Sequence, residues 1–360
     1  MKRIQRLPKT LVLAGVVLAS TFGMAITAAA QDVPDLQTPK PPLVLNGQGS
    51  FFLGGQVINA AAGDLGPGRA PGQIVINQSY VDYMIPQGNT KVPVVMTHGA
   101  GISGKSWETT PDGRMGFDEY FVRNGHPTYV VDRTFNGRAG FDVTVFNKVR
   151  AGTLLPSALP SMTRTSAELA WTGFRFGPSF GVPYPDTQFP VEKMIEFAKQ
   201  GIPSFSLLPP GTPQPLYKDL ADLAKKLNGA VLMGHSASGL FPAEAALVDS
   251  TGIKGIILTE PGLSPANYTD AQVAKLATVP ILMLWNDHLG TGQQALFDAD
   301  IAFINRINAA GGNAQMLHPP ALGIFGNSHM FMLDKNNLQI ADLILKWIDE
   351  NVGKNKVAKK

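Results

Sequence analysis

A serine set among small residues is the first candidate for chemistry in this sequence. Ser236 lies in the run GHSASG at 234–239, directly after the apolar stretch 230–233 and before a helical pattern. A sharp strand-to-helix turn with small neighbours holds such a serine in a strained backbone and exposes its hydroxyl. The following helix would point its N-terminus at the site, where negative charge is stabilised. The pattern predicts a nucleophilic Ser236, although an ordinary strand-to-helix turn can carry the same small residues.

A serine nucleophile needs a histidine base, and the sequence offers six candidates: His98, His126, His235, His288, His318 and His329. The order of a catalytic triad at a strand–serine–helix turn is serine, then acid, then histidine, which leaves the last three. His329 lies in the run GNSHM at 326–330, just before a final amphipathic pattern, and we predict that it is the base. We expect His318 at a surface or strand end and His235 in the core.

Two carboxylates follow apolar strand patterns between the serine and this histidine. Glu260 follows the stretch 253–258, and Asp287 follows the stretch 279–285. Either could orient the histidine and stabilise its protonated form. Position alone favours Asp287, because the triad acid commonly follows the later strand.

The loop after the apolar stretch 92–97 is a candidate oxyanion hole. It begins at His98 with the run HGAG. In a serine hydrolase, one backbone amide of such a loop and the amide of the residue after the nucleophile stabilise the tetrahedral oxyanion. We therefore predict that the amides of Ala100 and Ala237 are the two donors, with Gly101 as the alternative to Ala100.

The same loop also satisfies a nucleotide-binding pattern. The run GAGISGKS at 99–106 matches G-x-x-x-x-G-K-[ST], which requires a helix that opens at the lysine so that its amides cradle a phosphate. Here the chain continues WETTPDG, a poor helix former with proline and glycine. We expect no nucleotide site.

The surrounding patterns predict a mostly parallel sheet flanked by helices. Two alternating segments, 50–58 and 74–85, precede buried apolar stretches that alternate with helical ones, as crossover connections require. The buried strands are expected at 92–97, 128–131, 230–233, 253–258 and 279–285, and the helices at 216–227, 298–309 and 338–351.

Residues 143–205 break this rhythm, and we predict that they form a cap insertion over the site. The segment is too long for a plain loop, and its aromatic content argues against a disordered insertion. Its aromatic residues suggest an apolar pocket that prefers uncharged esters, with candidate substrate-binding residues Trp171, Phe174, Phe176 and Phe180.

The first thirty residues have the features of an export signal. Lys2, Arg3, Arg6 and Lys9 precede an apolar stretch that ends in Ala28-Ala29-Ala30, which predicts cleavage after Ala30; an uncleaved membrane anchor is the alternative. Loss of these four positive charges, with no acidic residue among them, changes the net charge from +3 to −1. A nucleic-acid partner then has no electrostatic basis.

Two other types of site are not expected. The chain contains no cysteine, so cysteine nucleophiles and thiolate ligands are excluded. Histidines and carboxylates show no metal-ligand spacing, and the adjacent Asp287 and His288 are not expected to face one ion together.

These motifs together resemble an atypical group of bacterial serine esterases in the α/β-hydrolase superfamily. The resemblance covers about residues 50–350 and is most specific in HGAGISGKSWETTPDGR at 98–114, GHSASGLFP at 234–242, LTEPG at 258–262 and GNSHM at 326–330. It implies an α/β-hydrolase fold, a triad acid at Glu260 with Asp287 as the alternative, no cofactor and an ester substrate. It leaves room for a homodimer.

We therefore predict an exported serine esterase, secreted or periplasmic, that acts through an acyl-enzyme. The alternatives are a hydrolase of a lactone, thioester or amide, and an inactive binding protein that retains the fold.

Overall fold

An eight-stranded sheet forms the centre of the molecule in the computed structural model, which describes residues 41–205 and 214–352. Its strand order is β1-β2-β4-β3-β7-β8-β9-β10. β1 pairs antiparallel with β2, and β2 pairs antiparallel with β4. The remaining pairs are parallel. The carboxyl ends of these parallel strands therefore lie at one edge, where ligands bind in open sheets of this kind.

The strands of this sheet are β1 (Leu45–Ala60), β2 (Gly72–Pro86), β3 (Val94–Thr97), β4 (Thr128–Asp132), β7 (Ala230–His235), β8 (Ile253–Thr259), β9 (Ile281–Leu284) and β10 (Ala314–Leu317). A second, separate sheet has two strands, β5 (Met162–Thr163) and β6 (Ser204–Phe205). The helices are α1 (Phe117–Arg123), α2 (Thr144–Arg150), α3 (Ala167–Gly173), α4 (Met194–Ala198), α5 (Pro215–Lys226), α6 (Phe241–Val248), α7 (Asp270–Leu276), α8 (Thr291–Ala309) and α9 (Asn337–Asn351).

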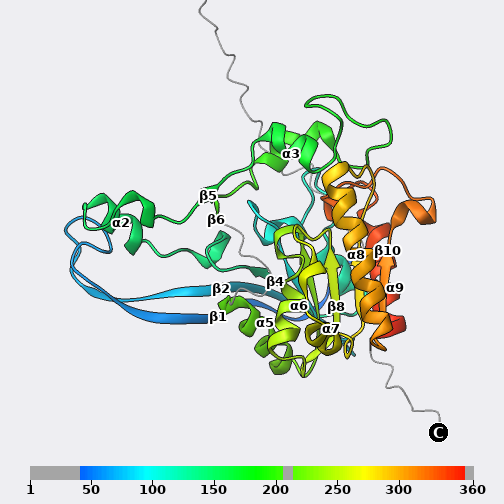
Figure 1. The fold of residues 1–360 in the computed structure, drawn as a ribbon, viewed down its shortest axis with the longest axis horizontal. Helices are drawn as coiled ribbons and strands as arrows, with labels where there is room; N and C mark the ends of the chain where they lie inside the picture. Colours follow the sequence, from blue (N-terminus) through cyan, green and yellow to red (C-terminus); the bar gives the residue numbers. More distant parts are fainter. Residues whose placement is uncertain (1–40, 206–213, 353–360) are drawn as a thin grey trace, which may run out of the picture.

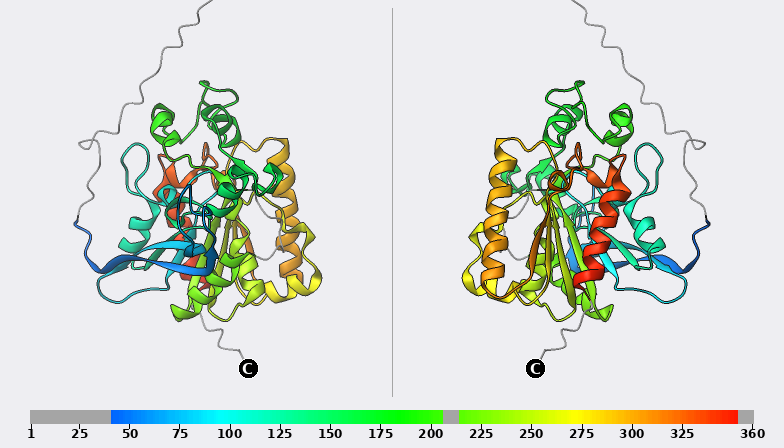
Figure 2. Two further views of the ribbon diagram at one scale, coloured as in Figure 1. Left: turned by 90° about the vertical axis from the view of Figure 1, so that its left-hand side faces the viewer. Right: turned by 90° about the vertical axis from the view of Figure 1, so that its right-hand side faces the viewer.

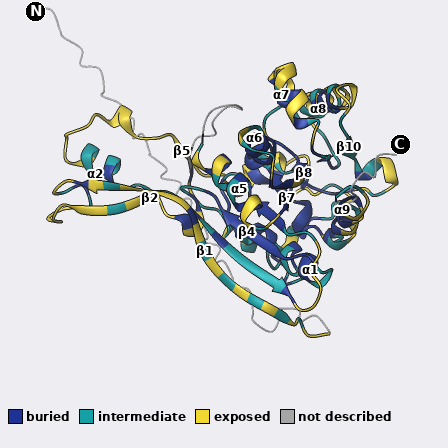
Figure 3. Cartoon of the chain, turned by 90° about the horizontal axis from the view of Figure 1, so that it is seen from below, coloured by how far each residue is buried: buried dark blue, intermediate teal, exposed yellow. Residues whose placement is uncertain are grey.

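The core is divided into two layers by the sheet, because successive side chains of a strand point to opposite faces. Val95 of β3 packs in the layer with α5, α6, α7 and α8, whereas Val94 and Met96 pack in the layer with α1, α3, α4 and α9. Burial on both faces explains why the central strands are continuous apolar runs. Figure 3 shows these central strands buried and much of β1 exposed.

Local sequence signals account for several helix boundaries. α5 begins with Pro215 in its first turn, where a missing amide costs nothing, and it buries Leu216 and Leu220 on one face. α7 begins with a capping box in which Thr269 and Gln272 satisfy each other's backbone amides.

Residues 143–205 divide into two parts. α2 lies beside the far end of the β1–β2 hairpin (Figure 1), where Asn147 and Lys148 contact Asp64. The second part, from β5 to β6, lies over the strand ends (Figure 2). Three backbone hydrogen bonds join it to two loops: Ile202 bonds to Gly101 in the loop after β3, and Gln188 and Phe174 bond to Gly326 and His329 in the loop at 323–330. The first part of the segment that we predicted as a cap thus packs on the hairpin instead.

The predicted parallel sheet with flanking helices is confirmed, and all seven predicted strands and all three helices are present. α8 begins seven residues earlier than predicted, at Thr291. The predicted export signal lies outside the described residues. Among those that are described, no helix has the length and apolar content needed to cross a membrane.

Candidate active site

Ser236 occupies a sharp turn at the carboxyl end of β7. Its φ of 56° lies in the left-handed region, which costs free energy in a residue other than glycine. A single 3-10 turn, Ser236–Ser238, follows, and α6 begins only at Phe241. The predicted helix is therefore present, but this tight turn separates it from the serine. Pro242 lies in the first turn of α6, where a proline is tolerated.

Three glycines allow the backbone to pack closely around this turn. A Cβ on Gly234 would lie 2.1 Å from the carbonyl oxygen of Ser238, and one on Gly239 would lie 2.5 Å from the Cα of Pro261. A Cβ on Gly99 would lie 2.9 Å from the Cβ of Ser236. Small residues are thus a steric requirement of the turn, and the loop after β3 lies directly against Ser236.

His329 lies beside the serine turn. The His235 ring bonds through Nε2 to the carbonyl oxygen of His329 at 2.9 Å, and the two imidazole rings are 4.6 Å apart. His235 is fully buried between Trp107 and Phe331, as expected for a core residue. The Ser236 hydroxyl makes no hydrogen bond within residues 41–205 and 214–352. Such bonds often tighten only when substrate is bound.

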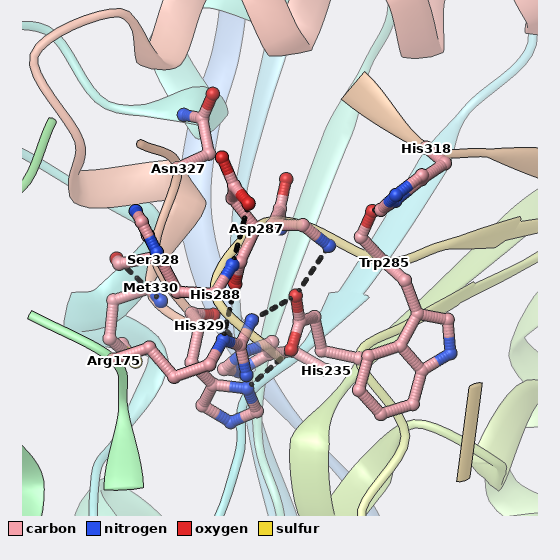
Figure 4. Close-up of polar contacts among 12 residues, drawn as sticks. Arg175, His235, Trp285, Asp287, His288, His318, Asn327, Ser328, His329 and Met330 are labelled. Carbon is pink, nitrogen blue, oxygen red and sulfur yellow. Dashed lines mark hydrogen bonds and ion pairs between the residues drawn. The ribbon is translucent and has the colours of Figure 1, made fainter. Parts of the chain in front are cut away.

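Glu260 connects His329 to the segment that covers the site. Its Oε2 lies 2.9 Å from Nδ1 of His329, and its Oε1 accepts hydrogen bonds from Nη2 of Arg175 at 2.6 Å and from the Asn286 amide at 2.8 Å. Arg175 also donates from Nε to the carbonyl oxygen of Asp287 (Figure 4). Both Arg175 and Glu260 are buried and adopt positive φ angles, of 62° and 48°.

The charges around Glu260 keep it ionised. Burial alone would raise the pKa of its carboxyl group, but the Arg175 guanidinium and the His329 ring hold that pKa well below its ordinary value. An ionised Glu260 fixes the proton of His329 on Nδ1 and leaves Nε2 free to accept another. Burial, followed by the nearby His329, lowers the pKa of His235 well below its usual range, so His235 stays neutral.

A buried carboxylate shapes the loop that carries His329. Asp334 accepts hydrogen bonds from the amide and hydroxyl of Ser328 and from the side-chain amide of Asn327. Burial raises the pKa of Asp334 to about 6. The loop also stacks against the covering segment, because the rings of Phe174 and His329 lie 5.2 Å apart at an angle of 23°.

The two predicted oxyanion donors, Ala100 and Ala237, lie in the loop after β3 and in the 3-10 turn that begins at Ser236. Neither the amide of Ala100 nor that of Ala237 has a hydrogen-bond partner among the residues described. The carbonyl of Gly101 accepts the amide of Ile202, which fixes the loop after β3.

Asp287, the alternative acid, does not contact His329 here. Its carboxylate accepts the amides of His288 and Gly326, at 2.7 and 3.1 Å. Ligand atoms of Asp186, Asp287 and His288 lie within 4.8 Å of one another, so the expectation that the adjacent pair could not face one ion is geometrically wrong. His288 also bonds to Asp186 and stacks on Tyr184, and these contacts account for the cluster without a metal.

The four aromatic residues predicted for the pocket have different environments. Trp171 and Phe176 are buried in the core layer, and Phe180 is 50% exposed. Phe174 alone among them lines a recess beside the candidate oxyanion loop, a cavity of about 30 Å³ that also includes Ala100.

The nucleotide-binding pattern in residues 99–106 does not form the required helix. Gly104–Trp107 is one 3-10 turn, and Lys105 donates its ammonium to the carbonyl of Thr109. Asp132, at the end of β4, accepts the Gly104 amide and the Arg138 side chain. These residues hold the loop after β3 in place and present no phosphate cradle.

Sequence reasoning missed Arg175. It lies in the insertion, 85 positions from Glu260, and no periodicity or motif singles it out. An arginine among buried aromatics was the one available signal, because a buried cation requires a partner.

Comparison with known proteins identifies relatives of this chain. A novel bacterial esterase whose structure was solved at atomic resolution is 43% identical, with a TM-score of 0.82 over 88% of this chain and 99% of that chain. The probable secreted lipase phiG of a fungus (strain ATCC 74256) is 24% identical over 328 residues, 75% of this chain and 85% of the relative. No family model matches.

The sheet order, the serine turn and these similarities define an α/β-hydrolase fold, as predicted. The chain belongs to the family of the solved bacterial esterase.

Proposed function

We propose that the protein is a serine esterase that hydrolyses carboxylic esters through an acyl-enzyme. The observation that carries this proposal is the chain of contacts from Arg175 through Glu260 to His329 beside a serine in a left-handed turn. Two relatives, an esterase and a probable secreted lipase, support ester hydrolysis.

In the proposed reaction, Ser236 Oγ attacks the ester carbonyl while Nε2 of His329 takes the hydroxyl proton. The amides of Ala100 and Ala237 donate to the oxyanion of the tetrahedral intermediate. His329 then returns the proton to the departing alcohol, and an acyl–serine ester remains. Water then attacks the acyl–serine carbonyl and gives a proton to His329, which passes it to Ser236 Oγ as the acyl–oxygen bond breaks and the carboxylic acid leaves.

Glu260 and Arg175 act on the orientation and charge of His329. An ionised Glu260 stabilises the imidazolium that forms in each step. Since Arg175 comes from the covering segment, we further propose that this segment, from β5 to β6, is a cap that assembles the site as well as enclosing it.

The proposed nucleophile is tested by the Ser236→Ala variant with short-chain 4-nitrophenyl esters. The expected result is a loss of kcat/KM of roughly 10⁴-fold or more, because residues of a triad act as a unit. Circular dichroism must show that the variant is folded. Turnover at the wild-type rate by the folded variant would exclude this mechanism.

The proposed acid is tested by two matched amide substitutions. Glu260→Gln removes the charge beside His329 and should lower kcat/KM by roughly 10²-fold to 10⁴-fold. Asp287→Asn alters a carboxylate whose hydrogen bonds, among the residues described, come from the backbone amides of His288 and Gly326, and it should cost less than about tenfold. The reverse order of effects would identify Asp287 as the acid.

We also propose that the protein is exported and cleaved after Ala30, which the secreted relative supports. Expression of the full chain in a bacterial host, followed by N-terminal sequencing, should give a released protein that begins at Gln31. Retention of Met1 in a membrane fraction would instead support the anchor alternative.

A further inference from the structure

Arg133 is a buried cation that forms no ion pair with an acidic residue in the part of the chain that the structure describes. It follows β4 directly and is 6% exposed. Its Nη2 bonds to the hydroxyl of Ser204 at 3.1 Å, and its Nε has no hydrogen-bond partner. No carboxylate of the described residues forms an ion pair with it, and the sequence of 206–213 contains no Asp or Glu. Burial lowers the pKa of Arg133 to about 10, so it remains protonated at neutral pH.

This cation lines a large cavity. The cavity measures about 460 Å³, within the range typical of small-molecule sites. Its walls are mostly apolar and include Phe146 and Phe241. Asn136 adds a second buried polar atom without a partner, its Oδ1. Asp142 also lines the cavity, but it accepts the amide of Thr144 and does not pair with Arg133.

The cavity adjoins the proposed nucleophile. Phe241 lines both this cavity and the small recess that contains Ser236 and Ala237. A second connection runs through the backbone: the Arg133 amide lies 3.3 Å from Nε2 of His98, and the next residue, Gly99, packs on Ser236. β4 is separated from β7 by β3 alone, so their carboxyl ends lie about 10 Å apart.

Buried charges in proteins are paired, because an isolated one loses its hydration without compensation. From these observations we infer that Arg133 binds a carboxylate of the substrate, so that the natural substrate is an ester that carries a second, ionised acid group. A guanidinium fork suits a carboxylate, which can accept two parallel hydrogen bonds. This inference rests on the proposed function. It also opposes the preference for uncharged esters that the aromatic residues of 143–205 predicted.

The inference is tested with paired substrates that differ in one group. One series consists of 4-nitrophenyl monoesters of dicarboxylic acids, from succinate to pimelate. Each is matched with a neutral ester in which an isopropyl group replaces the carboxylate. A second pair places the carboxylate on the alcohol: 4-acetoxybenzoate against 4-isopropylphenyl acetate. For wild type, kcat/KM of the carboxylate member should exceed that of its neutral match by roughly tenfold or more in at least one pair.

The Arg133→Met variant should bring this ratio close to one, and Arg133→Lys should keep part of it. Arg69→Met, which removes an exposed cation away from the cavity, is the matched control and should keep the wild-type ratio. If Arg133→Met does not fold, Arg133→Lys decides, since an ammonium keeps the charge but loses the fork geometry, and its ratio should then fall clearly below that of wild type.

These measurements test the esterase activity and the role of Arg133 separately. If wild type hydrolyses neither member of any pair and a fluorophosphonate probe does not label Ser236, the proposed function is wrong. Turnover in which wild type favours the neutral members, or in which Arg133→Met and Arg69→Met give the same ratio, would overturn the role of Arg133 and leave the esterase intact.

Discussion

Arg175 should control the orientation of the proposed catalytic histidine although it touches no reacting atom. The Arg175→Met variant removes the 2.6 Å bond to Glu260 and the 2.8 Å bond to the carbonyl of Asp287. Loss of one partner of a buried pair costs about 3–5 kcal/mol in unfolding free energy. Glu260 keeps its bonds to His329 and the Asn286 amide, so we expect the lower end, about 3 kcal/mol.

The effect on catalysis should exceed what lost stability alone explains. A misplacement of about 1 Å in a catalytic group costs about 10²-fold, so we expect kcat/KM to fall by that factor, with the loss in kcat. Without the guanidinium the pKa of Glu260 rises, so the acid limb of the kcat/KM profile should move to higher pH.

Steady-state kinetics between pH 4 and 9 and urea denaturation measure both effects. Arg175→Lys retains the charge but loses the fork, and it should fall between wild type and Arg175→Met. A folded Arg175→Met protein with wild-type kcat and an unshifted acid limb would refute the role of Arg175 in positioning Glu260.

Two further predictions follow from the same geometry. Gly99→Ala places a Cβ 2.9 Å from Cβ of Ser236 and 3.1 Å from Nδ1 of His235. It should therefore cost about 1–3 kcal/mol in unfolding free energy and lower kcat for short esters. Wild-type values of both quantities would contradict the close packing. Because the folded-state pKa of Glu260 is depressed, its charge stabilises the fold above its ordinary pKa of 4.5, and this contribution is lost as the pH falls below that value. Urea titrations should therefore show a steeper loss of stability below that pH for wild type than for Glu260→Gln, and equal slopes would count against an ionised, paired Glu260.

The sheet could be predicted from the sequence because its signals are local. Strands buried on both faces are short apolar runs, and the residues that follow them, such as Ser236, Glu260 and Asp287, must lie at one edge. β10 was missed because its four residues include Gln315 and alternate only weakly. The glycines around Ser236 were visible as small residues, although their contacts were not.

The covering segment could not be predicted at the same level. Its aromatic residues indicated order, but the same composition serves a core or a pocket, and Trp171 and Phe176 belong to the core. Arg175 contacts Glu260 only through the tertiary fold. The role that we propose for Arg133 depends on its burial beside a cavity, which the sequence does not reveal. Long-range pairing of charges leaves no periodic trace in one sequence.

The choice of acid shows how geometry and position can disagree. Position along the chain favoured Asp287, whereas the resemblance implied Glu260. In the structure the carboxylate of Glu260 contacts His329, and that of Asp287 supports the loops beside it. The two amide variants described above separate these roles in solution.

Active-site labelling determines whether Ser236 is an activated nucleophile. The mature protein is treated with a fluorophosphonate probe, and the adduct is located by mass spectrometry in wild type, Ser236→Ala and His329→Ala. We expect one adduct, on Ser236, that is absent from Ser236→Ala and strongly reduced in His329→Ala. Well-folded wild-type protein that remains unlabelled, or that is labelled at another residue, would contradict this expectation.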